Sequence, residues 1–199
     1  MAMIDLDNKQ IVAKIVVYGP GQSGKTTFLR AVHDLIPEKQ RNALTSIEND
    51  SGRTVLFDNL PIDAGKVGDY RVRFQLYSVA GNEGSEDARN AVLSGADGVV
   101  FLADAQPDRL AENAESLDEL LAALARLQKS PGAFPLVIQY NKVDLVDESL
   151  LVETRQALNA DGYPETFSSA LNKRGVVDSL QTITKAGRAV TLADSRFRR

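Results

Sequence analysis

Cysteine and tryptophan are absent from this 199-residue chain, and histidine occurs once, at His33. Without cysteine the chain has no disulfide, no thiolate metal ligand, no thiol nucleophile and no site for a prenyl or palmitoyl anchor. A single imidazole without any thiol also argues against a transition-metal centre. These absences remove thiol chemistry and transition-metal chemistry from the functions to be considered.

The chain also has no excess of basic residues, and it has no long apolar run. The chain has 23 Lys and Arg against 27 Asp and Glu, a net charge of −4, which lacks the basic footprint of nucleic-acid binding. No run reaches the roughly 18 apolar residues of a membrane helix. The first residues do not resemble a signal peptide, and Ala2 stands where myristoylation requires glycine. We expect a cytoplasmic protein that binds no nucleic acid and has no stable membrane anchor.

The composition that remains is that of an ordinary globular protein, with 43% hydrophobic and 25% charged residues. At about 150 residues per domain, the length predicts one domain. We expect this domain to span residues 1–193, followed by a basic tail at 194–199 that carries three arginines. The tail is interpreted as solvated and disordered, with contact to acidic lipid as the alternative.

Short apolar blocks predict strands. Ile11–Tyr18, Val99–Leu102 and Leu136–Ile138 are almost continuously apolar, as in parallel strands covered on both faces. Tyr70–Leu76 instead alternates apolar and polar residues, which predicts a half-exposed strand. It is expected to pair with Val55–Phe57 as an antiparallel hairpin at a sheet edge. The intervening loop, with Pro61, Gly65 and Gly68, is longer than a tight turn.

Helical periodicity is clearest between residues 108 and 129, where five apolar residues fall on one helical face: Leu110, Ala114, Leu117, Leu121 and Leu124. Other helices are predicted over Lys25–Leu35, Glu86–Leu93, Ser149–Asn159 and Gly175–Val190. Strands and helices therefore alternate. This pattern predicts an α/β fold of three layers, with about five helices and a mostly parallel six-stranded sheet that has one antiparallel edge strand.

The strongest motif is the segment GPGQSGKT at residues 19–26, which satisfies the P-loop pattern G-x-x-x-x-G-K-[ST] between a predicted strand and a predicted helix. Its glycines let the backbone turn N–H groups toward phosphate, and the helix N-terminus adds partial positive charge. Lys25 can reach the β- and γ-phosphates, where it also serves catalysis, and the Thr26 hydroxyl can ligate Mg²⁺. The predicted phosphate-binding residues are Gly19, Gln22, Ser23, Gly24, Lys25, Thr26 and Thr27.

A second motif selects the base. Asn141, Lys142 and Asp144 form an N-K-x-D sequence at the end of a buried strand, where open α/β sheets bind ligands. A carboxylate at Asp144 can accept hydrogen bonds from guanine N1–H and the 2-amino group, a donor pair that adenine lacks. The aliphatic stem of Lys142 can lie along the base. The motif favours GTP over ATP, and therefore disfavours a P-loop ATPase or kinase.

With both motifs in place, the whole chain resembles the Ras-like small GTPases, and among them the bacterial MglA family of cell-polarity GTPases. The resemblance extends over KIVVYGPGQSGKTT, GRTVLFDNLP, RFQLYSVAGN, GADGVVFLADAQPDRLAENAESL and VIQYNKVDL. It implies that Thr54 in the first switch ligates Mg²⁺ when γ-phosphate is present. It also implies that Arg53 acts as an arginine finger in cis, which would stabilise charge on the γ-phosphate oxygens. A solvated loop arginine is the alternative.

The second switch departs from the general family pattern D-x-x-G-Q. Ser78 replaces the aspartate that holds Mg²⁺ through water, a change that fits the MglA relatives and predicts weaker metal binding. Gly81 remains to sense γ-phosphate through its N–H. Asn82 replaces the glutamine that orients the attacking water, and its shorter side chain predicts slow or partner-dependent hydrolysis. Glu83 is an alternative group for orienting the water.

The remaining family element contacts guanine O6 through backbone N–H groups, and here it comprises Ser169, Ala170 and Leu171. Leu171 replaces the usual lysine, which a main-chain contact tolerates. The resemblance implies a switch that binds GTP or GDP with Mg²⁺, hydrolyses GTP and changes shape near residues 38–60 and 78–90. It also implies a GTPase-activating Roadblock-domain homodimer similar to MglB, unidentified effectors, and recruitment to a cell pole. A non-hydrolysing nucleotide-binding scaffold is the alternative, and Ser78 and Asn82 favour it.

Overall fold

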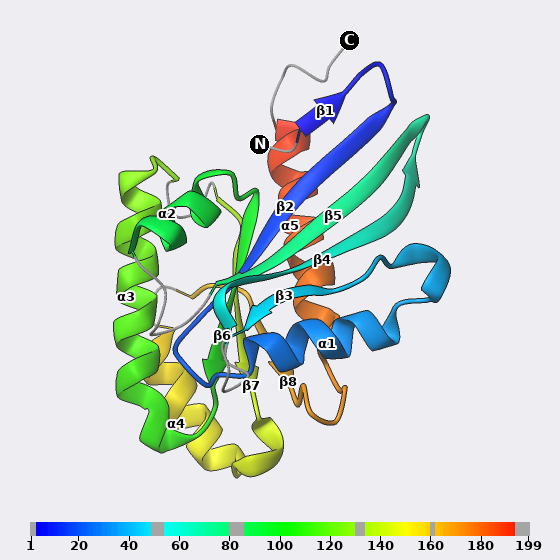
Figure 1. The fold of residues 1–199 in the computed structure, drawn as a ribbon. Helices are drawn as coiled ribbons and strands as arrows, with labels where there is room; N and C mark the ends of the chain where they lie inside the picture. The colour runs from blue at the N-terminus through cyan, green and yellow to red at the C-terminus, as the bar shows by residue number, and fades with distance from the viewer. Residues whose placement is uncertain (1–2, 49–53, 80–85, 130–133, 160–161, 194–199) are drawn as a thin grey trace.

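A computed structural model describes residues 3–48, 54–79, 86–129, 134–159 and 162–193. Its strands form one eight-stranded sheet in the order β3-β4-β5-β2-β6-β7-β8, with β1 paired to β2 (Figure 1). The strands are β1 (Met3–Asp5), β2 (Gln10–Tyr18), β3 (Thr45–Glu48), β4 (Thr54–Val67), β5 (Tyr70–Val79), β6 (Gly98–Asp104), β7 (Leu136–Asn141) and β8 (Glu165–Ser168). Neighbours from β5 to β8 in this order are parallel, whereas β1, β3 and β4 pair antiparallel with their neighbours.

Two helices cover one face of the sheet and three cover the other. They are α1 (Lys25–Leu35) and α5 (Asp178–Ala193) on one side, and α2 (Glu86–Ser94), α3 (Leu110–Arg126) and α4 (Glu148–Leu158) on the other (Figure 1). Successive side chains of β2 point to opposite faces of the sheet and so pack in two different hydrophobic clusters. Val17 packs with Phe28 of α1, whereas Val16 packs in the cluster that includes Leu120 of α3. The predicted three-layer α/β architecture with five helices is therefore confirmed.

The predicted number of six strands is wrong, because β1 and β3 also join the sheet. These strands have three and four residues, which is too short for a clear apolar pattern. The antiparallel part is accordingly larger than the single expected edge strand.

The predicted long loop before Tyr70 is also wrong. β4 continues to Val67, and two residues, Gly68 and Asp69, connect it to β5. Pro61 is tolerated because it lies beyond the end of the paired β3 segment, and Gly65 lies in a bulge between Asp63 and Lys66.

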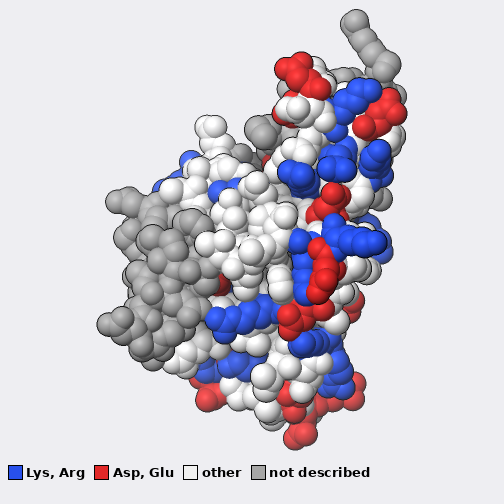
Figure 2. All heavy atoms as spheres, turned by 45° about the vertical axis from the view of Figure 1, so that its right-hand side comes forward, with Lys and Arg blue, Asp and Glu red and all other residues white. Residues whose placement is uncertain are grey.

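Charges on the surface are mixed. Figure 2 shows Lys and Arg side chains interspersed with Asp and Glu on the face that it presents. Lys9 pairs with Asp69 at 3.8 Å, and Arg71 pairs with Asp63 at 3.6 Å. Within the described ranges, no helix is both long enough and apolar enough to cross a membrane.

Candidate nucleotide site

The P-loop connects the end of β2 to the start of α1, and two of its glycines are required by close packing. Gly19 has φ +150° and Gly24 has φ +95°. A Cβ atom at Gly19 would lie 2.3 Å from the carbonyl oxygen of Leu102, and one at Gly24 would lie 2.5 Å from Nδ2 of Asn141. Within the part of the chain that the structure describes, no side chain caps the N-terminus of α1, whose first turn includes Thr26 and Thr27. Its backbone N–H groups and the helix dipole are therefore suited to bind an anion.

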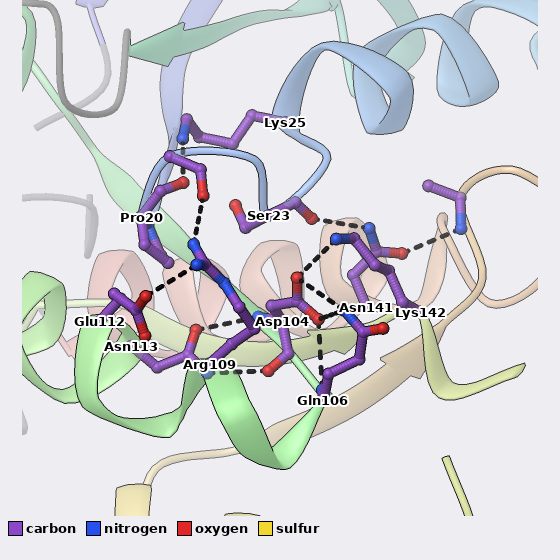
Figure 3. A network of polar contacts seen from close by, with 12 residues as sticks. Pro20, Ser23, Lys25, Asp104, Gln106, Arg109, Glu112, Asn113, Asn141 and Lys142 are labelled. Carbon is purple, nitrogen blue, oxygen red and sulfur yellow. Dashed lines mark hydrogen bonds and ion pairs between the residues drawn. The ribbon is translucent and has the colours of Figure 1, made fainter. Parts of the chain in front are cut away.

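Lys25 is buried under this loop, with 8% of its surface exposed. Its Nζ donates a hydrogen bond to the carbonyl oxygen of Pro20 at 2.7 Å (Figure 3). The same nitrogen donates a second hydrogen bond to the carbonyl oxygen of Gly19 at 2.8 Å. Burial lowers the pKa of Lys25 to about 8, and the nearby carboxylate of Asp58 opposes that shift. The ammonium is thus held at the phosphate-binding loop in an environment that favours an added negative charge.

A buried carboxylate lies beside the P-loop at a position that the sequence motifs did not indicate. Asp58 of β4 is fully buried and accepts hydrogen bonds from Thr26 Oγ1 at 2.8 Å and Ser78 Oγ at 2.6 Å. Asp58 and Ser78 are direct partners in the pairing of β4 with β5. A signal was present in the sequence, because Asp58 shares a strand face with Leu60 and Ile62, both of which are buried.

These side chains suit a hard cation. Thr26 and Ser78 supply hydroxyl oxygens and Asp58 supplies a carboxylate, which are the oxygen donors that Mg²⁺ prefers. The residues therefore fit the metal expected from the P-loop. Thr54, the other predicted metal ligand, is the first residue of β4, and its side chain is not among those described.

Asn141 joins three parts of the site. Its Nδ2 donates to the carbonyl oxygen of Ser23 at 2.9 Å, and its Oδ1 accepts from Ser168 Oγ at 3.1 Å and Ala170 N at 2.9 Å. The N-K-x-D segment is thereby connected both to the P-loop and to the loop after β8. Predicted residues from three distant stretches of sequence lie together at the carboxyl ends of β2, β7 and β8.

Lys142 has a buried acidic partner in Asp104 at the end of β6. Its Nζ lies 2.5 Å from Asp104 Oδ2 (Figure 3). Asn113 of α3 fixes the backbone of Asp104 by bonding its N–H at 2.9 Å and its carbonyl oxygen at 2.8 Å. Asp104, which sequence analysis did not assign to the site, therefore orients the lysine of the base motif.

The predicted base-reading loop follows β8. Asp144 is exposed, and its Oδ2 accepts a hydrogen bond of 3.2 Å from Nδ2 of Asn172, which also donates to Ser169 Oγ at 2.9 Å. Ser169 and Ala170 are buried, whereas Leu171 is 80% exposed. The loop closes at Gly175, where φ is +67° and a Cβ atom would lie 2.0 Å from the carbonyl oxygen of Phe167. α5 therefore begins at Asp178, after the predicted start at Gly175.

Some predicted residues are not placed. Arg53, Gly81 and Asn82 lie outside the residues that the structure describes, as does Glu83. Gln22 is described, and it is exposed with φ +64°, a backbone conformation uncommon for a side chain other than glycine.

Comparison with known proteins agrees with this geometry. A model of the ADP-ribosylation factor (Arf) family matches residues 1–186. The chain is 38% identical to the mutual gliding-motility protein MglA of Myxococcus xanthus over 185 residues, which cover 93% of this chain and 95% of that protein. It is 26% identical to Ras-related protein Rab-7a of Dictyostelium discoideum over 190 residues, covering 94% and 86% of the two chains. The chain belongs to the Ras-like small GTPases, and within them to the MglA family.

Proposed function

We propose that this protein is a switch that binds GTP and GDP and hydrolyses GTP slowly, and that its nucleotide state selects partners. The observation that carries the proposal is the position of Asn141. This one side chain bonds the P-loop at Ser23 and the base-reading loop at Ala170. A ligand that has both a guanine base and a polyphosphate would engage both loops at once.

We assign the phosphates to the P-loop and the first turn of α1. Lys25 would exchange its bonds to the Gly19 and Pro20 carbonyl oxygens for phosphate oxygens. That exchange is favourable because the partly desolvated ammonium group would be paired with a negatively charged phosphate oxygen instead of neutral carbonyl groups. Asp144 and the backbone N–H of Ala170 would bind the guanine edge, since adenine presents no matching donor pair.

We assign Mg²⁺ to Thr26 and Asp58, with the hydroxyl of Ser78 next to Asp58. Thr54 is a further proposed ligand, on the strength of the resemblance. Held by these residues, the ion would supply positive charge that offsets the negative charge developing on the phosphate. Thr26 and Ser78 both donate to the Asp58 carboxylate, so two hydroxyl groups fix its orientation. We propose that Asp58 supplies from β4 the negative charge that the family pattern usually supplies at the position of Ser78.

The catalytic step is assigned to Arg53 and Asn82 on the strength of the resemblance alone. An arginine at position 53 would stabilise the charge on the transferring phosphoryl group. Asn82 carries the amide of the usual glutamine on a shorter side chain, which would position the attacking water poorly. Loss of γ-phosphate would remove the contacts of Gly81 and Thr54, and the two switch segments near residues 38–60 and 78–90 would change conformation.

The relative in Myxococcus xanthus is named a mutual gliding-motility protein. We propose that the present chain likewise controls polarity or motility, through effectors at a cell pole and a Roadblock-domain homodimer that accelerates hydrolysis. The second candidate is a non-hydrolysing scaffold. It is favoured by Ser78, which replaces a carboxylate in the second switch and is a buried hydrogen-bond donor.

Single-turnover hydrolysis of pre-bound GTP would test the proposal, with and without a Roadblock-domain protein encoded nearby. Slow turnover that the partner accelerates is the expected result. Tight GTP binding without turnover in either condition would favour the scaffold. Turnover by the protein alone at the rates of partner-stimulated enzymes, about 1–20 s⁻¹, would contradict slow hydrolysis. Failure to bind guanine nucleotides would overturn both candidates.

A further inference from the structure

The carbonyl groups of the P-loop are held by side chains that reach it from several directions. Lys25 bonds the carbonyl oxygens of Gly19 and Pro20, and Asn141 bonds that of Ser23. Lys25 is part of the motif itself, and Asn141 belongs to the base motif. The carbonyl of Gly21 is bonded by Arg109, a residue that neither motif contains.

Arg109 reaches the loop from the start of α3. It is the last residue of a short 3₁₀ turn, Pro107–Arg109, and it directly precedes α3. Its Nη2 donates to the carbonyl oxygen of Gly21 at 3.1 Å, and its Nη1 donates to Glu112 Oε1 at 2.7 Å (Figure 3). The side chain is 24% exposed, so most of it is shielded from water. The guanidinium therefore bridges α3 and a loop 88 residues away in sequence.

The bond to Gly21 fixes the orientation of one peptide group. In a trans peptide the C=O and the following N–H point in opposite directions. When Arg109 holds the Gly21 carbonyl, the N–H of Gln22 is therefore directed away from the guanidinium group. Backbone N–H groups of this loop are the groups expected to bind phosphate, so the contact determines whether one of those donors is available.

A second observation indicates that this peptide needs support. Gln22 has φ +64°, in the left-handed region that costs a non-glycine residue free energy. Such conformations persist where the surrounding structure holds them in place. The tethered Gly21 carbonyl immediately precedes the strained residue, and Asn141 bonds the carbonyl of Ser23, which immediately follows it. Gln22 is thus held on both sides by side chains from other elements.

We propose that Arg109, oriented by Glu112, is a positioning residue that keeps the P-loop in its phosphate-binding conformation and thereby slows release of the bound nucleotide. The proposal rests on the proposed function, since it concerns retention of GDP and GTP. Arg109 acts through the backbone of Gly21 and Gln22. Its loss should therefore weaken the binding of phosphate-bearing ligands and leave recognition of the base unchanged.

The test measures release of fluorescent GDP from the purified full-length protein in excess unlabelled GDP. Removing a charged hydrogen-bond donor in Arg109→Ala should accelerate release about five- to tenfold. Arg109→Lys keeps the positive charge and a single nitrogen that can donate to the Gly21 carbonyl, so it should restore much of the retention. Glu112→Gln should accelerate release about twofold, because it weakens only the orientation of the guanidinium. Arg71→Ala is the matched control, since it removes an arginine from the β5 surface that pairs with Asp63.

Competition by guanosine separates positioning from a general loosening of the fold. Guanosine has no phosphate, so its affinity should be the same in wild type and in Arg109→Ala, while GDP affinity falls. Equal losses for the two ligands would mean a general structural role and would overturn the proposal. If Arg109→Ala does not fold, Arg109→Gln takes its place in the experiment. The shorter glutamine side chain cannot contact both the Gly21 carbonyl and Glu112.

Unchanged GDP release in a folded Arg109 variant would also overturn the inference, with the proposed function left intact. Failure of the wild-type protein to bind GDP at all would overturn the proposed function itself, and the inference with it.

Discussion

Ser78 donates a hydrogen bond of 2.6 Å to Asp58 across the antiparallel pairing of β4 with β5, and both side chains are buried. The family pattern has a carboxylate at the position of Ser78. In this chain a carboxylate lies on the neighbouring strand instead, and it also accepts a bond from Thr26. β4 and β5 together therefore provide a carboxylate, from Asp58, and a hydroxyl, from Ser78, beside the hydroxyl of Thr26.

The first prediction concerns metal affinity. Asp58→Asn keeps the size of the side chain but removes the negative charge, so Mg²⁺ binding should weaken about tenfold or more. GDP release should then lose most of its dependence on Mg²⁺, measured as the ratio of release rates with excess Mg²⁺ and with excess chelator. A thermal melt without Mg²⁺ is the control for folding. An unchanged ratio in the folded variant would remove Asp58 from the metal site.

Because Asp58 pairs with Ser78, the effect of a carboxylate at position 78 should depend on whether position 58 also carries one. Ser78→Asp alone restores the family pattern but places two carboxylates at hydrogen-bond distance, which disfavours ionisation of both. We expect it to lower the melting temperature and to give no gain in Mg²⁺ affinity. The double variant Ser78→Asp with Asp58→Asn should regain the melting temperature and the Mg²⁺ affinity of the wild type. A gain in metal affinity from Ser78→Asp alone would show that the two carboxylates can share the site.

The third prediction is a pH dependence. Burial lowers the pKa of Lys25 to about 8, and a bound phosphate would raise it. Below about pH 8 the empty protein already carries the proton, so GDP affinity should vary little with pH. Above it, binding must take up a proton, and affinity should fall by up to about tenfold per pH unit. Titrations of GDP binding between about pH 7 and 9 test this, and Lys25→Met should show weak binding without that slope.

The same group affects the stability of the empty protein in the opposite sense. The unfolded chain holds the Lys25 proton up to its ordinary pKa of 10.5, whereas the folded chain releases it near pH 8. The unfolded state therefore binds more protons between these values, and this group makes stability rise with pH in that window. Lys25→Met should raise the melting temperature of the nucleotide-free protein at pH 7, and the difference should shrink by about pH 10.

The residues that sequence analysis identified share one property, which is that their motifs are local. The P-loop and the N-K-x-D segment are recognisable because glycine, lysine and aspartate occur at fixed short spacings beside clear strands. Asp58 and Arg109 have no such spacing. Asp58 meets Ser78 only through the register of β4 on β5, and Arg109 meets Gly21 only through the packing of α3 beside the loop. Long-range pairing of this kind is not encoded in any short pattern.

A further prediction concerns Asn82, the catalytic residue that only the resemblance identifies. Asn82→Gln adds the methylene that the family's water-orienting side chain has, and we expect it to raise the rate of single-turnover hydrolysis about tenfold. GDP release should stay the same, because the proposed role is confined to the attacking water. An Asn82→Gln variant that binds GTP normally but hydrolyses it no faster would favour Glu83, or a residue from the Roadblock-domain partner, as the group that orients water.

The last prediction concerns selectivity for guanine. Asn172 donates to Asp144 at 3.2 Å and to Ser169 at 2.9 Å, so it holds the carboxylate that we assign to the N1–H and 2-amino groups. Asn172→Ala frees that carboxylate to rotate, and GDP affinity should fall about two- to tenfold, as for the loss of one hydrogen bond to a charged group. Inosine diphosphate lacks the 2-amino group and gains less from a fixed carboxylate, so its affinity should fall less. The ratio of the two affinities, measured by competition, is therefore the decisive quantity. An equal loss for both ligands would mean that Asn172 only stabilises the loop after β8.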